Sequence, residues 1–174
     1  VLLRGAINDS AIAMYYPIKT IQANYKATAK SSGAILSDYY NYYKIIDKTA
    51  KNILESGHDF NFIRDKSIKN SEIKNGELMI ANQSYKCVVM PQVEIIPLPI
   101  LKKLEEFEEN GGLVIWVKGL PKMGVNRDQH EAVQKMVDKY YKVSSFGKTL
   151  IENLIEVDEA ELQVDGSHNE FYCG

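Results

Sequence analysis

The chain has 174 residues, of which 45% are hydrophobic and 25% charged, a composition typical of a single globular domain. Its formal net charge of −2 gives no electrostatic reason to expect a nucleic acid or an anionic membrane surface as partner. No apolar run approaches the ~20 residues that cross a bilayer. From the charge and the absence of such a run, we expect neither nucleic acid nor membrane binding.

The two ends of the chain indicate a piece of a longer protein. Residue 1 is a valine without the charged-then-apolar pattern of a signal peptide, and the sequence stops in "HNEFYCG", where an aromatic segment has barely begun. We expect an N-terminal extension at 1–10, an α/β domain at 11–145 and a C-terminal segment at 146–174 that leads into the next domain. Neighbouring domains of the parent chain are the expected partners, and the localisation stays open.

The first half of the chain predicts two strands, one long loop and one long helix. The apolar run "AIAMYY" at 11–16 is closed by a proline, which is typical of a buried strand in a parallel sheet. The polar, lysine-rich stretch 17–33 has no clear period and predicts a long loop. Apolar residues and tyrosines at three- and four-residue steps predict a helix over 34–56, and "DFNFIRD" at 59–65 predicts the second strand.

The second half predicts a hairpin, two more strands and two more helices. Asn75-Gly76 indicates a tight hairpin turn after a short helical turn. The segments "KCVVMP" at 86–91 and "LVIWV" at 113–117 predict the third and fourth buried strands. Between these strands a helix begins at Pro97 and Pro99 and ends at Asn110-Gly111-Gly112, because proline suits a first helical turn. A further helix is expected over 129–141, followed by a short helix and a strand within 145–164.

This order of elements predicts the α/β class with a flavodoxin-like three-layer sandwich. The central sheet should be mainly parallel, with strand order 2-1-3-4 and room for a fifth strand. Ligands of such sheets bind beyond the carboxyl ends of the strands. A ligand-binding crevice would therefore contain Pro17, Gln92 and Gly119, which follow the first, third and fourth strands.

Residues able to carry catalysis or bind a metal are isolated in the sequence. Cys87 stands at the start of its strand, at the opposite end of the sheet from the expected site, and is interpreted as a small buried hydrophobic residue. Cys87 and Cys173 form neither a disulfide framework nor a metal motif, so the redox compartment stays open. His58, His130 and His168 have no metal-ligand spacing. We expect no metal, no cofactor and no catalytic residue in this chain.

Nucleotide and phosphate sites have little support. No glycine-rich phosphate-binding motif follows the first strand. The "KSSG" stretch at 30–33 could hold an anion at a helix N-terminus, although Ser31 and Ser32 more often only cap a helix. A receiver domain needs an acidic phosphoacceptor after the third strand, where this chain has Pro91 and Gln92.

The segment "YKCVVMPQVEIIPLPILKKLEEFEENGGLVIWVKGLP" resembles the amidotransferase-like domains of bacterial glycoside hydrolases. These are the β-galactosidase trimerisation domain and its equivalent in large α-L-rhamnosidases, and both are similar to class I glutamine amidotransferases. The shared features are a Tyr-Lys before a strand, a proline after it, a helix about six residues later and a Gly-Gly before the next strand. "AIAMYYP", "DFNFIRD" and "NGELMIANQSYK" extend the resemblance over roughly 11–121, with the rhamnosidase type slightly nearer.

The resemblance implies a domain without catalytic residues, which packs beside a catalytic barrel or mediates contacts in a homo-oligomer. In class I amidotransferases the turn after a strand carries the nucleophile, whereas the turn here reads Lys118-Gly119-Leu120-Pro121. The fragment is then no enzyme by itself, while its parent is a glycoside hydrolase that would fit a periplasmic or secreted location. Two alternatives stay open: a small-ligand or carbohydrate-binding domain that uses the predicted crevice, and a stand-alone amidotransferase-like enzyme that uses Cys87.

Overall fold

A four-stranded parallel sheet forms the centre of the fold. The computed structural model describes residues 10–25 and 35–143. The sheet consists of β1 (Ile12–Tyr15), β2 (Asn61–Ile63), β6 (Cys87–Pro91) and β8 (Leu113–Val117), in the order β2-β1-β6-β8. The predicted order 2-1-3-4 is therefore confirmed for the four strands that the sequence predicted.

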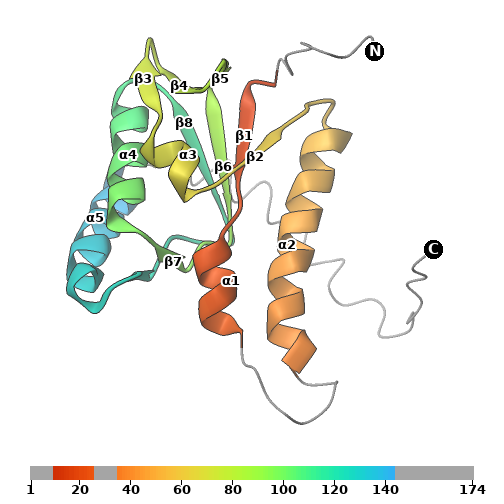
Figure 1. Cartoon of the computed structure of the whole chain (residues 1–174), viewed down its shortest axis with the longest axis vertical. Helices are drawn as coiled ribbons and strands as arrows, with labels where there is room; N and C mark the ends of the chain where they lie inside the picture. The colour runs from red at the N-terminus through yellow and green to blue at the C-terminus, as the bar shows by residue number, and fades with distance from the viewer. Residues whose placement is uncertain (1–9, 26–34, 144–174) are drawn as a thin grey trace.

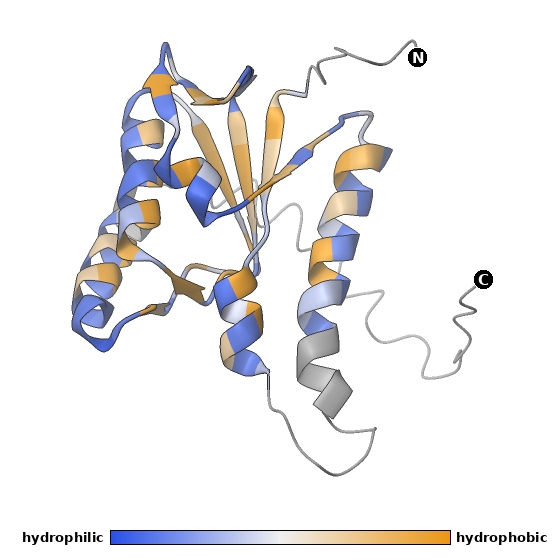
Figure 2. Cartoon of the chain, viewed as in Figure 1, coloured by the Kyte–Doolittle hydropathy of each residue, from blue (hydrophilic) through white to orange (hydrophobic). Residues whose placement is uncertain are grey.

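Helices cover both faces of this sheet, which confirms the three-layer α/β architecture. Helix α2 (Ile35–Glu55) lies on one face, and α4 (Leu98–Glu109) and α5 (His130–Val143) lie on the other (Figure 1). Helix α4 follows Pro97 directly and has Pro99 in its first turn, as predicted. Each helix turns an apolar side to the sheet and polar residues to solvent, whereas the central strands are largely apolar (Figure 2).

Successive residues of the strands point into two separate cores. On β1, Ala13 and Tyr15 belong to the larger core beneath α4 and α5, whereas Met14 belongs to the smaller core beneath α2. On β6, Val88 and Val89 are divided between the two cores in the same way. Burial on both faces explains why these strands read as continuous apolar runs in the sequence.

A three-stranded antiparallel sheet lies between β2 and β6 in the chain. Its strands are β3 (Glu72–Lys74), β4 (Glu77–Ile80) and β5 (Gln83–Tyr85), preceded by the short helix α3 (Asp65–Lys69). Asn75 and Gly76 form the β3–β4 turn with φ of 53° and 77°, so the predicted hairpin is confirmed. Strand β5 was not predicted.

Several predictions for the loops were wrong. The stretch predicted as a long loop contains the helix α1 (Ile18–Asn24), which buries Thr20 and Ile21. This helix has only seven residues, too few for a helical period to stand out in the sequence. A second unpredicted feature is a two-stranded parallel sheet of β7 (Ile95–Ile96) and β9 (Met123–Gly124), followed by the 3₁₀ turn η1 (Arg127–Gln129).

Some predictions lie outside the described residues. These are the helix and strand expected within 145–164, the serines at 31 and 32, His168 and Cys173. Most of the N-terminal extension, residues 1–9, is outside them as well. The predicted domain boundaries at 10 and 145 therefore stay predictions.

Candidate functional site at the carboxyl edge of the sheet

The three residues of the predicted crevice follow three adjacent strands of the parallel sheet. Pro17 comes after β1, Gln92 after β6 and Gly119 after β8. Their environments differ, because Pro17 is buried, Gln92 is half-buried and Gly119 is exposed. The structure thus places all three at the carboxyl edge, while their role in ligand binding stays a prediction.

Gln92 has an unusual backbone and a side-chain oxygen without a partner. Its φ is 39°, in the left-handed region, and its backbone N–H donates to the Val117 carbonyl at 2.8 Å. The side-chain Oε1 is buried and has no hydrogen-bond partner in the part of the chain that the structure describes. A buried amide oxygen normally accepts a hydrogen bond. Gln92 could accept one from a water molecule or from a ligand hydroxyl.

The turn after β8 has the positive-φ backbone often found at functional sites, but it lacks the side chain of a nucleophile. Lys118 and Gly119 both have positive φ, at 65° and 112°. A lysine at positive φ is uncommon, and such conformations cluster at functional sites. Lys118 is nevertheless exposed, whereas an activated lysine nucleophile needs a desolvated amine. This turn therefore provides neither a thiol, nor a hydroxyl, nor a desolvated amine for covalent chemistry.

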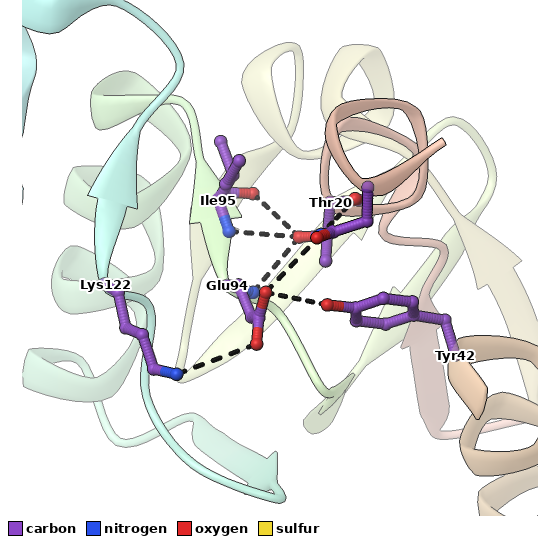
Figure 3. Close-up of polar contacts among 6 residues, drawn as sticks. Thr20, Tyr42, Glu94, Ile95 and Lys122 are labelled. Atoms are coloured by element: carbon purple, nitrogen blue, oxygen red, sulfur yellow. Dashed lines mark hydrogen bonds and ion pairs between the residues drawn. The ribbon is translucent and has the colours of Figure 1, made fainter. Parts of the chain in front are cut away.

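Glu94, which sequence reasoning missed, is the centre of a polar cluster beside this edge (Figure 3). Its Oε2 accepts a hydrogen bond from the Tyr42 hydroxyl on α2 at 2.7 Å and a weaker one from the Asn24 amide at 3.4 Å. Its Oε1 lies 3.7 Å from the Lys122 Nζ. One half-buried carboxylate thus connects α1, α2 and the segment before β9.

The Thr20 hydroxyl fixes the backbone next to Glu94. Thr20 is fully buried, and its Oγ1 accepts from the Glu94 and Ile95 N–H groups at 3.1 and 3.0 Å. The same hydroxyl lies 3.3 Å from the Ile95 carbonyl, to which it donates. A buried hydroxyl with three backbone partners is a structural connector between α1 and β7. No sequence signal identifies it, because the partners are separated by 75 residues.

Replacement of Thr20 with valine should lower the free energy of unfolding by about 2 kcal/mol, because two buried N–H groups lose their acceptor. Thr20→Ser keeps the hydroxyl and should lose less. Thr49→Val is the matched control, since the Thr49 Oγ1 is also buried but only donates to the Ile45 carbonyl of its own helix. Urea denaturation of the three variants measures the difference. Equal losses for Thr20→Val and Thr49→Val would contradict the connector role.

Cys87 lies at the opposite edge of the sheet, as predicted. It is the first residue of β6, where it pairs with Ile12 and Leu113, and it packs against the core beneath α2. Burial raises the pKa of its thiol to about 12. A reactive cysteine needs a lowered pKa and a positive neighbour. Cys87 is half-buried, and the interpretation of Cys87 as a small hydrophobic residue packed against the core agrees with this environment.

Alkylation of Cys87 should be slow in the folded chain at pH 8, because only the thiolate reacts and burial raises its pKa to about 12. The measurement is the rate of iodoacetamide labelling in a Cys173→Ser background. We expect a rate at least about 100-fold below that of the same chain in urea, where the thiol regains a pKa near 8.5. Labelling of the folded chain as fast as in urea would show that Cys87 is accessible and ionised.

Metal-ligating side chains of the described residues do not gather at this edge or elsewhere. Within residues 10–25 and 35–143, no three His, Cys, Asp or Glu side chains lie close enough together to hold a metal ion. His58 is exposed, and the His130 ring lies 2.9 Å from the Asn126 carbonyl.

Within residues 10–25 and 35–143, no helix has the length and apolar character required to span a membrane.

Comparison with solved structures shows a similarity to part of a beta-galactosidase. No protein-family profile matches the chain, and no curated protein sequence matches it either. The fold is similar to part of the crystal structure of a beta-galactosidase from Bifidobacterium adolescentis, with a TM-score of 0.47 and 18% sequence identity. The match covers 67% of this chain and 45% of that one, so this chain spans less than half of the beta-galactosidase. A similarity of this size identifies neither a shared family nor a shared activity.

Proposed function

We propose that this chain is a non-catalytic domain of a larger bacterial glycoside hydrolase. Its role is to pack against neighbouring domains of the parent chain or to join copies of the parent in a homo-oligomer. The assignment to a glycoside hydrolase depends on the sequence resemblance over roughly 11–121, and the rhamnosidase type is the nearer parent within that resemblance.

The observation that carries the non-catalytic role is the turn after β8. In class I amidotransferases this position presents the nucleophile, whereas here it presents the exposed Lys118 and Gly119. The one cysteine among the described residues lies at the other edge of the sheet, with a raised pKa. Glu94, a carboxylate beside this edge, is held by Tyr42 and Lys122. The Lys118–Gly119 turn, Cys87 and Glu94 therefore support a structural role for this domain better than a catalytic one.

The coding sequence on both sides of residues 1–174 tests the proposed parent. We expect it to encode a catalytic barrel, or a β-sandwich of the kind that accompanies such barrels, in the same reading frame. An open reading frame without either domain would end the glycoside hydrolase proposal.

Self-association can be tested with the chain alone. Exposed apolar side chains such as Phe62 and Leu54, which are 54% and 55% exposed, are available for contacts with another domain or another copy. Sizing by light scattering should give a dimer or a larger assembly if this domain joins copies by itself. A monomer at all concentrations would leave packing against neighbouring domains as the only role.

A second candidate function is the binding of a small ligand or carbohydrate at the carboxyl edge. The buried Oε1 of Gln92, which has no partner among the described residues, favours it, because a sugar hydroxyl could donate to that oxygen. Ligands of parallel sheets bind at this edge. The site would then combine Gln92 with the turns at Pro17 and Gly119.

Titration with galactose and rhamnose, followed by amide chemical shifts, tests this second function. Binding should shift the amides of Gln92 and Gly119, and Gln92→Ala should remove the shifts. Gln134→Ala, at an exposed position on α5, is the matched control and should bind as the wild type does. Shifts that persist in Gln92→Ala would place the ligand elsewhere.

A further inference from the structure

The indole nitrogen of Trp116 on β8 is a buried donor without a partner. Trp116 is only 4% exposed and belongs to the larger core beneath α4 and α5. Its Nε1 has no hydrogen-bond partner among residues 10–25 and 35–143. An indole nitrogen can donate a hydrogen bond but cannot accept one. Because nearly all buried polar groups in proteins are hydrogen-bonded, Trp116 requires an acceptor close to its N–H group.

Gln92 presents the complementary group at the end of the neighbouring strand. Its Oε1, an acceptor, is buried and also lacks a partner in the described part of the chain. Trp116 pairs with Met90 on β6, and the Gln92 N–H donates to the Val117 carbonyl at 2.8 Å. Gln92 therefore lies beside the residue that follows Trp116. Within the described ranges, these are the two buried side-chain polar atoms without a partner, and both belong to residues at this one point of the carboxyl edge.

One hydroxyl oxygen can satisfy both groups. The Trp116 Nε1 and the Gln92 Oε1 do not bond to each other, so a group that joins them must accept from one and donate to the other. Hydroxyl groups and water molecules do both. Polar side chains beside this edge are already bonded elsewhere, since Glu94 accepts from Tyr42 and the Thr20 hydroxyl accepts from the Glu94 N–H. The chemistry required between Trp116 and Gln92 is therefore that of a hydroxyl.

We propose that one hydroxyl oxygen binds between Trp116 and Gln92, where it accepts from the Trp116 Nε1–H and donates to the Gln92 Oε1. The hydroxyl belongs to a water molecule or to a small molecule such as a sugar, and both have the same hydrogen-bonding chemistry. The left-handed φ of 39° at Gln92 supports a binding site, because strained backbone conformations cluster where ligands are held. The site does not require the carbohydrate binding proposed above, since water alone can fill it.

Water NOE and ROE spectroscopy of the full chain tests this site. Trp116 is the only tryptophan in the sequence, so its indole N–H gives a single assignable signal. With bound water, this proton should show cross-peaks at the water frequency that have opposite sign in the two experiments, which distinguishes water binding from hydrogen exchange. Gln92→Met should weaken these cross-peaks at least about 3-fold, because the water loses an acceptor. Gln134→Met, at an exposed position on α5, is the matched control and should leave them unchanged.

Addition of galactose or rhamnose identifies the source of the hydroxyl. Unchanged water cross-peaks assign the site to water, whereas their replacement by NOEs from sugar protons assigns it to the sugar, and both results support the site. An indole N–H with neither water nor sugar cross-peaks would overturn the proposal. Cross-peaks that persist at full strength in Gln92→Met would overturn it as well.

A double-mutant cycle provides an independent test. Trp116→Phe removes the donor and Gln92→Met removes the acceptor, and each should lower the equilibrium constant of folding, measured in urea. Because both side chains bind the same oxygen, the double variant should keep a folding constant at least about 5-fold above that expected from the product of the two single effects. Trp116→Phe combined with Gln134→Met should show no such coupling. Independent effects of Trp116→Phe and Gln92→Met would contradict the shared site.

Discussion

Replacement of Phe107 with alanine should lower the free energy of unfolding by about 4 kcal/mol. Phe107 is fully buried in the larger core, where α4 packs on the sheet. Removal of the ring leaves a cavity that the neighbouring side chains fill only partly, so the loss of dispersion contacts adds to the lost transfer free energy. Urea denaturation followed by circular dichroism measures the change.

The matched control is Phe62→Ala, the same substitution at a side chain that is 54% exposed. Phe62 keeps edge-to-face contacts with Tyr16 and Phe60, at centroid distances of 6.0 and 5.2 Å. Its loss should therefore cost only about 1 kcal/mol. A loss for Phe107→Ala no larger than that for Phe62→Ala would contradict the packing of α4 described above.

Replacement of Gly112 with alanine should lower the free energy of unfolding by about 3 kcal/mol. A Cβ at Gly112 would lie 2.1 Å from Cε2 of the Phe107 ring, much closer than atoms can approach. The ring is packed on all sides, so it cannot move away without disturbing the core. The loss should be partly recovered in the double variant Gly112→Ala/Phe107→Leu, because the smaller side chain makes room.

Gly111→Ala separates this clash from backbone strain. Gly111 has a φ of +94°, but a Cβ there would meet nothing within 4 Å. Its substitution should therefore cost only about 1 to 2 kcal/mol, from the left-handed backbone conformation. A Gly112→Ala variant no less stable than Gly111→Ala would contradict the predicted clash between a Cβ at Gly112 and the Phe107 ring.

The elements predicted from sequence were those with strong local signals. The strands β1, β6 and β8 are apolar runs; β1 and β6 are buried on both faces, whereas β8 is buried on one face and partly exposed on the other. Proline, glycine or Asn-Gly marks the ends of α2 and α4 and the β3–β4 turn. Right-handed crossovers then restrict how such strands can be ordered. This combination explains why the order β2-β1-β6-β8 could be predicted.

The features that were missed depend on contacts between distant residues. Helix α1 is short and is held by Thr20, whose partners lie 74 and 75 residues away. The Tyr42 hydroxyl meets Glu94 across 52 residues. The tyrosines of α2 were predicted as part of its helical period, but the partner of the Tyr42 hydroxyl depends on how α2 packs. Such pairs have no local pattern, so a single sequence does not reveal them.

The candidate site was predicted in position only. Parallel topology places the turns at Pro17, Gln92 and Gly119 at one edge, and the structure has them there. What the edge contains depends on backbone conformation, such as the positive φ of Gln92 and Lys118. Glutamine and lysine rarely adopt positive φ, so the residue types at these two positions do not predict it.

The most direct test of the proposed non-catalytic role is glycoside hydrolysis by the longer polypeptide to which the proposal assigns this chain. The wild type and the double variant Gln92→Ala/Lys118→Ala would be compared on galactoside and rhamnoside substrates. We predict that the wild type hydrolyses one of them and that kcat/KM of the variant agrees within about 2-fold, because the proposed function assigns the catalytic acid and base to another domain. A loss of 100-fold or more in kcat of the folded variant, or no hydrolysis by the wild type, would contradict the account.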